Sequence, residues 1–160
     1  MPDLVYFHFA PLRLSPGSII LPGNWGRVLR RYENATATGQ LFGSAWILAR
    51  ELLFEIVRLR QFAQRPSRFE AAFCCPNEGH ARVYQAKVDL PRIQVLHRVE
   101  LVDPTLPTHV APIDMLDWPA PNTSFLDETQ ARATTYWTGV PDVIQEVVTL
   151  SALRVVANID

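Results

Sequence analysis

The stretch Leu4-Val-Tyr-Phe-His-Phe-Ala10 is an apolar segment with one histidine in its middle, and a Pro-Gly pair follows it closely. Side chains alternate between the two faces of a strand, so His8 shares a face with Tyr6 while Phe7 and Phe9 share the other. The apolar face with the two phenylalanines is predicted to be core. The simpler interpretation of His8 is a partly buried histidine bonded to a neighbouring carbonyl, and the alternative is that it carries chemistry.

The length and composition of the chain predict one globular domain spanning residues 1–160. At 160 residues and 48% hydrophobic composition, the chain can bury a sizeable core without room for a large second domain. Its net charge of -1 and pI near 6.4 give no overall field that attracts nucleic acid or an anionic membrane.

The two cysteines, Cys74 and Cys75, are adjacent, which suits neither an ordinary disulfide nor a four-ligand zinc site. A reducing cytoplasm is therefore the expected location. The amino terminus lacks the pattern of a secretory signal, and charged residues interrupt the longest apolar stretch, Leu41 to Leu59. No membrane association is expected.

Residues 44–62 form the longest predicted helix, with Ser44 as its N-cap. Apolar residues recur at helical spacing and are predicted to face protein over most of the circumference. Glu51, Glu55 and Arg58 are predicted to mark the exposed edge. The apolar stripe consists of Leu48, Leu52, Ile56, Leu59 and Phe62.

The remaining pattern completes an α+β chain. The segment from Asn24 to Thr38 is ambiguous, and its three arginines are interpreted as a solvated basic face in preference to a phosphate site. Residues Val110 to Thr123 are predicted to be a proline-rich loop around Trp118. The last two strands are expected to join by a tight connection or to bend within one long pair. Strands are predicted at 67–75, 92–103, 143–149 and 152–159, and helices at 78–87, capped by Asn77, and at 127–136.

The sequence lacks the motifs of several common reaction classes. The chain has no phosphate loop, HExxH helix, nucleophile elbow or four-ligand zinc pattern, and no metal site is expected. Cys74 becomes a nucleophile only if a cation, from His80 or Arg68, lowers its pKa. A buried pair of thiols is the favoured interpretation.

Three pieces of sequence, in this order, have a counterpart in a known superfamily. The first is Tyr6-Phe-His8 followed by two glycine-containing turns that end at Gly17 and Gly23. The second is Ala71-Ala-Phe-Cys-Cys75 with the following segment from Glu78 to Tyr84. The third is Gln145-Glu-Val-Val-Thr149 with the closing strand Leu153-Arg-Val-Val156. This order resembles the ADP-ribosyltransferase superfamily, particularly the small rifamycin ADP-ribosyltransferases, the catalytic domains of poly-ADP-ribose polymerases and an uncharacterised bacterial group related to them.

The resemblance implies a split two-sheet ADP-ribosyltransferase-like sandwich with peripheral helices and with NAD in the cleft between the sheets. It implies an NAD-dependent mono-ADP-ribosyltransferase, a glycosyltransferase that releases nicotinamide and transfers ADP-ribose to an acceptor. The acceptor is a protein, a nucleic acid or a small molecule, and a bacterial or phage effector is the expected setting.

The resemblance also implies site residues. Glu146 is the expected catalytic acid, but Gln145 competes for this role because a one-residue shift exchanges which of them faces the cleft. His8 is expected to hold a ribose hydroxyl, and the backbone of Phe9 stands where the family has a small residue that grips the carboxamide. Phe73 takes the place of a tyrosine that stacks on nicotinamide. The expected cofactor-binding set also includes Gly17, Arg68 and Tyr84.

A second hypothesis is a non-catalytic interaction domain. Its aromatic surface would comprise Trp25, Trp118 and Trp137, next to an arginine-rich surface that contacts a protein or nucleic acid. This hypothesis predicts that the three tryptophans are accessible and that His8 and Glu146 do not share a cleft.

Overall fold

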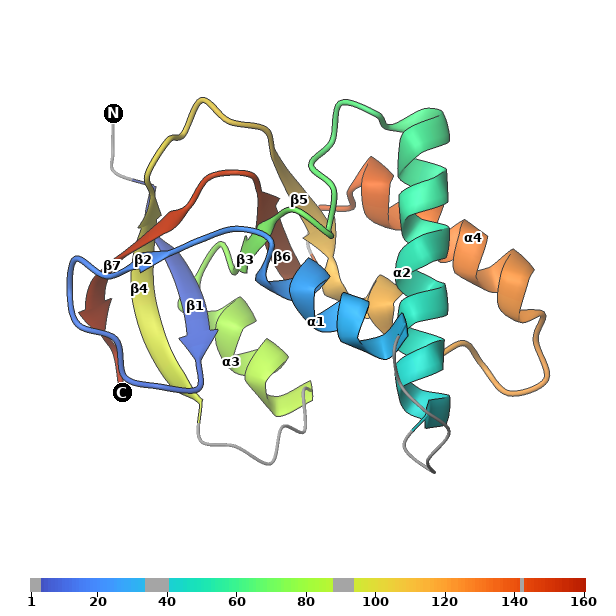
Figure 1. The fold of residues 1–160 in the computed structure, drawn as a ribbon, viewed down its shortest axis with the longest axis horizontal. Coiled ribbons are helices and arrows are strands. Elements are labelled where there is room, and N and C mark those ends of the chain that lie inside the picture. Colours follow the sequence, from blue (N-terminus) through green and yellow to red (C-terminus); the bar gives the residue numbers. More distant parts are fainter. Residues whose placement is uncertain (1–3, 34–40, 88–93, 142) are drawn as a thin grey trace.

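The computed structural model describes residues 4–33, 41–87, 94–141 and 143–160, and this part of the chain forms two antiparallel sheets and four α-helices (Figure 1). The four-stranded sheet lies at one side, the three-stranded sheet lies in the middle, and helices α2 and α4 lie at the other side. The predicted α+β class is confirmed.

The larger sheet has the order β1 (Tyr6–Ala10), β4 (Val95–Leu101), β7 (Leu153–Asn158) and β2 (Ile19–Ile20). β1 pairs with β4 so that His8 lies opposite His97. Leu96 and Val99 on β4 are fully buried, as expected for a strand that has neighbours on both sides. The early strand predicted around His8 is therefore an edge strand of this sheet.

The smaller sheet has the order β3 (Ala72–Cys74), β6 (Gln145–Thr149) and β5 (Thr108–Pro112). The prediction of a loop from Val110 to Thr123 is wrong at its start, because β5 runs to Pro112 and a short 3-10 helix, η1, follows at Ile113–Leu116. β5 tolerates a terminal proline because it is an edge strand, which does not need every N–H for pairing.

The last two strands belong to different sheets, so the prediction of one long pair is wrong, although the connection is tight. The Leu150 N–H donates to Pro107, next to β5, and the Ala152 carbonyl accepts from Val102, next to β4. The chain thus crosses from the smaller to the larger sheet at Ser151, which is fully buried. Local strand patterns do not encode this change of sheet.

A second connection joins the sheets near the amino terminus. Phe7 and Cys75 form an isolated antiparallel bridge in which each N–H donates to the other's carbonyl, at 3.0 and 2.7 Å. β1 of the larger sheet therefore lies directly against the end of β3 of the smaller sheet.

The helices are α1 (Asn24–Glu33), α2 (Leu41–Gln61), α3 (Glu78–Lys87) and α4 (Phe125–Thr138). α2 begins at Leu41, so Ser44 is not its N-cap. The Asn77 side chain accepts from the His80 N–H and caps α3 as predicted. Ser124 caps α4, and Gly139, with φ of 84°, ends it. No helix in the described ranges has the length and apolar composition of a membrane span.

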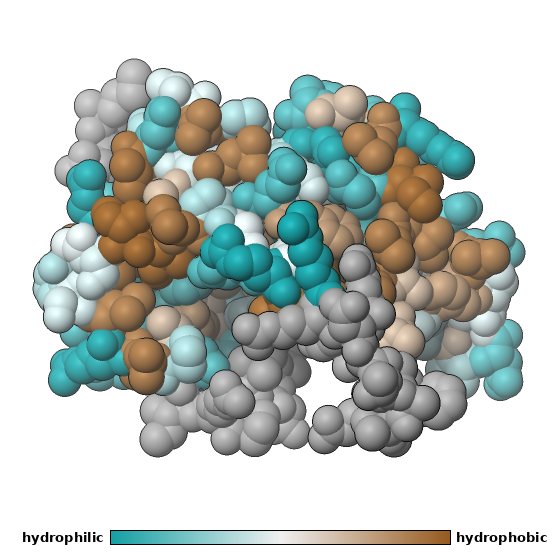
Figure 2. Space-filling view, in the orientation of Figure 1, coloured by the Kyte–Doolittle hydropathy of each residue, from teal (hydrophilic) through white to brown (hydrophobic). Residues whose placement is uncertain are grey.

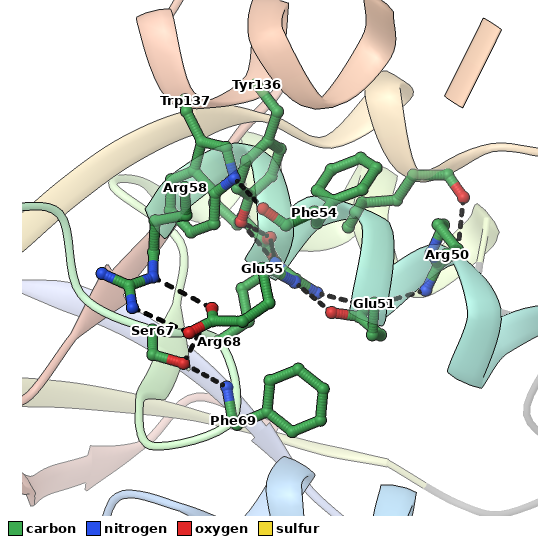
Figure 3. A network of polar contacts seen from close by, with 12 residues as sticks. Arg50, Glu51, Phe54, Glu55, Arg58, Ser67, Arg68, Phe69, Tyr136 and Trp137 are labelled. Atoms are coloured by element: carbon green, nitrogen blue, oxygen red, sulfur yellow. Dashed lines mark hydrogen bonds and ion pairs between the residues drawn. The ribbon is translucent and has the colours of Figure 1, made fainter. Parts of the chain in front are cut away.

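The long helix α2 is turned differently from the prediction. Glu51 and Arg58 are only 1% and 8% exposed, whereas Leu52 and Leu59, predicted to face the core, are 47% and 58% exposed. Figure 3 shows that Glu51 and Arg58 point into two groups of ion pairs and hydrogen bonds. Brown, apolar side chains reach the surface over α2 in Figure 2. The inward face of α2 therefore combines the apolar Phe54 and Val57 with ion-paired charged side chains, and it differs from the predicted stripe.

Candidate active site

A cavity of about 100 Å³, here called the inner pocket, opens where the two sheets meet. His8 from β1 and Glu146 from β6 both line it. The fold brings them together in two steps. The Phe7–Cys75 bridge places β1 against the end of β3, and β3 pairs with β6 so that Cys74 lies opposite Val147, the residue after Glu146.

The backbone of Phe9 turns toward this pocket. Phe9 lies opposite Leu96 of β4. The Leu96 N–H donates to the Asp160 side chain and its carbonyl accepts from the Ile159 N–H, so both groups point away from β1. The N–H and carbonyl of Phe9 therefore point away from β4. They point to the same side of β1 as the N–H and carbonyl of Phe7, which bond to Cys75. Among the described residues neither polar group of Phe9 has a backbone partner. The edge of β1 thus offers one donor and one acceptor to a ligand.

The His8 ring is half-buried and held in one tautomer. Its Nδ1 lies 2.7 Å from the Phe73 carbonyl oxygen. Because a carbonyl only accepts, Nδ1 carries the proton and Nε2 remains an acceptor. Burial lowers the pKa of His8 more than the hydrogen bond to Phe73 raises it, and the nearby His97 lowers it further. His8 is therefore neutral at physiological pH, and the expected bond to a neighbouring carbonyl is confirmed.

The Glu146 carboxylate is 4% exposed and is held from one side. Its Oε1 accepts from the Tyr136 hydroxyl at 2.5 Å and from the Arg68 guanidinium. Neither bond uses Oε2, and Glu146 lines the cavity. The carboxylate can therefore be fixed by protein at one oxygen while the other serves a ligand.

Arg68 is fixed from behind by a second carboxylate. Its Nε donates to Glu51 at 2.8 Å, and Arg50 donates to the other oxygen of Glu51 at 2.9 Å (Figure 3). Burial alone raises the pKa of Glu51, but the charges of Arg68 and Arg50 bring it below its ordinary value. Burial likewise disfavours the charge on Arg68, but Glu146 and Glu51 outweigh it and raise its pKa. Both groups remain ionised.

Two aromatic side chains complete the walls. The Arg68 guanidinium lies over the Phe73 ring, 4.8 Å from its centroid. Burial, with the charge of Glu146, raises the pKa of Tyr84 to about 12, so its hydroxyl stays protonated. Phe73 and Tyr84 line the inner pocket and also a second cavity.

The second cavity, here called the outer pocket, has a volume of about 280 Å³ and shares Phe73, Tyr84 and Glu146 with the inner pocket. Arg50 and Trp25 are among its other walls. Helix α1 brings Trp25 there, next to Gly26, where an added Cβ would lie 2.0 Å from the carbonyl oxygen of Phe69. Only glycine allows this close approach.

The structure separates two predicted residues from the site. Gly17 lies in the turn before β2, where its N–H donates to Val155 at 2.8 Å, and it lines neither pocket. The Gln145 side chain donates to the Val140 carbonyl at 3.0 Å and also lies outside both pockets. Of the two competing residues, Glu146 is the one that faces the cleft.

The cysteines line the inner pocket as free, buried thiols, as favoured from the sequence. Burial raises the pKa of Cys75 to about 12 and also that of Cys74, so neither is an activated nucleophile. Within the described ranges no cluster of three or more His, Cys, Asp or Glu could hold a metal.

Sequence reasoning missed three residues around the site: Glu51, Tyr136 and Arg50. Tyr136 marks the end of a predicted helix, and Tyr136-Trp137 also resembles the uncharacterised bacterial group, but neither observation assigns it a role at the site. The Arg50-Glu51 pair was a possible signal, because two adjacent charges inside an apolar helix need partners if the helix is covered.

The predicted basic face on α1 is partly described. Arg27 and Arg30 are exposed, and Arg27 donates to Asn24. The Arg31 side chain lies outside the described part of the chain. The preferred interpretation of this group, a solvated face, agrees with the two described side chains.

One comparison with protein families gives a match. A family with the description "Protein of unknown function (DUF2441)" matches residues 28–160, a span that contains Arg68, Tyr136 and Glu146 but not His8. No curated protein matches the sequence.

Proposed function

The chain belongs to the DUF2441 family, and we propose that it is an NAD-dependent mono-ADP-ribosyltransferase with a split two-sheet ADP-ribosyltransferase-like fold. The observation that carries the proposal is that His8 and Glu146, from opposite ends of the chain, line one cavity between two sheets. The unpaired backbone of Phe9 lies at the same cavity. These three features match the residues that the resemblance to the ADP-ribosyltransferase superfamily assigns to NAD.

The inner pocket suits the nicotinamide half of NAD. The carboxamide has one acceptor and a donor group, which complement the N–H and carbonyl of Phe9. Phe73 and Tyr84 supply flat apolar walls for the pyridine ring. Neutral His8 offers Nε2 to a ribose hydroxyl, which needs an acceptor.

The chemistry is substitution at C1′ of the nicotinamide ribose. The bond between C1′ and the pyridinium nitrogen breaks, and nicotinamide leaves as a neutral molecule with the bonding electron pair. An acceptor X–H forms the new C1′–X bond and loses its proton to Glu146 and then to water. Positive charge develops on the ribose in the transition state, so a fixed carboxylate stabilises it.

Arg68 has a different role in this proposal from the one expected from the sequence. Its donors are used by Glu146, Glu51 and Tyr136, all of them buried. We assign Arg68 to positioning the Glu146 carboxylate and not to contacting NAD. Tyr136 contributes to the same positioning through its hydroxyl.

The interaction-domain hypothesis has less support. Trp118 is 62% exposed, but Trp137 is fully buried and donates its indole N–H to the Phe54 carbonyl. The aromatic surface that this hypothesis requires is therefore incomplete. Its second expectation, that His8 and Glu146 do not share a cleft, is also wrong.

Cytoplasmic location belongs to the same proposal, because NAD is plentiful there and Cys74 and Cys75 are free thiols.

Nicotinamide release tests the proposed activity. Purified protein with NAD, in the absence of an acceptor, is expected to release nicotinamide slowly by transfer to water. Glu146→Gln keeps the size of the side chain and its ability to accept from Arg68 and Tyr136, but it removes the negative charge. We expect this variant to lose about 10²-fold or more in rate while it still binds NAD.

Glu100→Gln is the matched control, because Glu100 is paired with Arg154 on the surface of the larger sheet. It should keep the wild-type rate. Failure of the folded wild-type protein to bind NAD in calorimetry, or an unchanged rate in Glu146→Gln, would contradict the proposal.

A further inference from the structure

The outer pocket contains polar groups that the protein itself leaves unsatisfied. The indole Nε1 of Trp25 and the Nε of Arg50 are buried and have no hydrogen-bond partner. Both residues line the outer pocket. A buried donor without a partner costs about 1–3 kcal/mol, so such groups commonly mark the place of a ligand or ordered water.

The outer pocket lies on the acceptor side of the proposed reaction. It shares the wall formed by Phe73, Tyr84 and Glu146 with the inner pocket. The proposed function places nicotinamide in the inner pocket, and we infer that its C1′ then stands at this shared wall, beside Glu146. The incoming group must approach C1′ on the side away from the leaving group, and we assign this side to the outer pocket.

The charges around the outer pocket argue against an anionic occupant. Arg50 and Arg68 are balanced by Glu51 and Glu146, with which they form ion pairs. Asp117 adds a further carboxylate to the lining. An anion would therefore meet no net positive charge, although the unsatisfied groups of the pocket are donors. A ligand with an uncharged oxygen that accepts hydrogen bonds fits both the charge balance and the unsatisfied donors.

The remaining walls set the shape of the ligand. Ile113, Leu116 and the Trp25 indole are apolar surfaces, and a cavity of about 280 Å³, at the lower end of the range for ligand pockets, limits the occupant to a small molecule. A planar ring can pack on these walls, with a carbonyl oxygen toward Arg50 and Trp25 and a hydroxyl or ring N–H toward the free oxygen of Glu146.

We propose that the outer pocket binds the ADP-ribose acceptor and that this acceptor is an uncharged, ring-containing small molecule with a carbonyl oxygen. The proposal rests on the proposed transferase function. Trp25 and Arg50 determine the acceptor specificity. The hydroxyl or ring N–H of the acceptor loses its proton to Glu146 as the bond to C1′ forms and nicotinamide leaves.

The test uses two ring compounds of the same shape and different charge, para-hydroxybenzamide and para-hydroxybenzoate. Each is titrated into protein saturated with nicotinamide, while NMR follows the indole N–H resonances of the tryptophans. We expect the amide to move the Trp25 resonance and to bind at least about tenfold more tightly than the benzoate.

Trp25→Phe removes the unsatisfied donor and keeps an aromatic ring. It should weaken amide binding about fivefold to tenfold without lowering thermal stability, because the lost N–H has no partner in the free protein. Trp46→Phe is the matched control, since Trp46 Nε1 is also buried without a partner, but its ring stacks on Trp118 and neither residue lines this pocket. It should leave amide binding unchanged.

Three results would overturn the inference: no movement of the Trp25 resonance while nicotinamide still binds, tighter binding of the benzoate, or an equal shift of Trp25 with ADP, which would assign the pocket to NAD. Absence of nicotinamide binding would instead count against the transferase function. If nicotinamide does not bind but the amide still shifts the Trp25 resonance, the outer pocket is a ligand site but does not bind an ADP-ribose acceptor. The wild-type titration does not depend on the variants folding.

Discussion

At His8, one hydrogen bond decides what the side chain offers to a ligand. The Phe73 carbonyl accepts a hydrogen bond from Nδ1–H, which leaves Nε2 as an acceptor on the neutral ring. Glu146 is likewise used on one side only, by Arg68 and Tyr136. Both residues have a structural contact and a free acceptor, so the structural and functional interpretations of His8 do not exclude each other.

The lowered pKa of His8 gives a prediction for stability against pH. In the unfolded chain His8 takes up a proton near its ordinary pKa of about 6.5, whereas the folded ring resists protonation until lower pH. The unfolded state therefore binds more protons below about pH 6.5, and the free energy of unfolding falls as the pH drops. One such group gives a slope of at most about 1.4 kcal/mol per pH unit.

Urea unfolding at several pH values between about 7.5 and 5.5 measures this slope. In His8→Gln the slope should be smaller than in the wild type. A residual slope is expected from His109, whose pKa is also lowered by burial. Equal slopes in the two proteins would show that His8 titrates normally in the folded state.

At the scale of one element, α2 gives the sharpest test of the fold, because neighbouring residues have opposite surroundings. Glu51 is 1% exposed and pairs with Arg68 and Arg50, whereas Leu52 is 47% exposed. Glu51→Gln leaves buried cations without full compensation, at a cost of about 3 kcal/mol or more in the free energy of unfolding. Leu52→Gln should cost less than about 1 kcal/mol.

Chemical denaturation of both variants decides between the two orientations of α2. If the apolar stripe faced the core, as the sequence pattern predicts, the order would be reversed and Leu52→Gln would be the damaging change. Retained circular dichroism in both folded variants is the control that each still forms the helix.

The elements that the sequence predicts well are those with local signals. β1, α3 and α4 lie close to their predicted places, since strand alternation, the capping residue Asn77 and the acidic residues that begin α4 act over a few positions. Which face of α2 turns inward cannot be read from the helix sequence alone. It depends on Arg68, which reaches α2 only after the chain has turned at Ser67.

The candidate site was partly predictable, but from a resemblance to a known superfamily and not from local signals. His8, Phe9, Phe73, Tyr84 and Glu146, expected from family resemblance, line one pocket. Composition and spacing alone did not point to it. Trp25 and Arg50 reach the outer pocket from separate helices, and no pattern within either helix indicates this shared position.

At the scale of the whole molecule, the cleft is a joint between two sheets. The described connections between the sheets include the Phe7–Cys75 bridge and the crossing at Ser151. β1 contributes His8 and Phe9 to the inner pocket, and the smaller sheet contributes Phe73 and Glu146. A ligand in this pocket therefore contacts both sheets at once and should restrain their relative motion.

Amide hydrogen exchange can detect this restraint. In the free protein the Phe9 N–H faces the cleft without a backbone partner and should exchange fast, while the Phe7 N–H, bonded to Cys75, should exchange slowly. Saturating nicotinamide or NAD is expected to slow exchange at Phe9 about tenfold or more, because the carboxamide oxygen then accepts from this N–H. Protection should rise together at Cys75 and along β6, since the ligand holds the smaller sheet against β1. Protection confined to one sheet would mean that the ligand does not bridge them, and the catalytic role that we propose for a cleft shared by His8 and Glu146 would have to be abandoned.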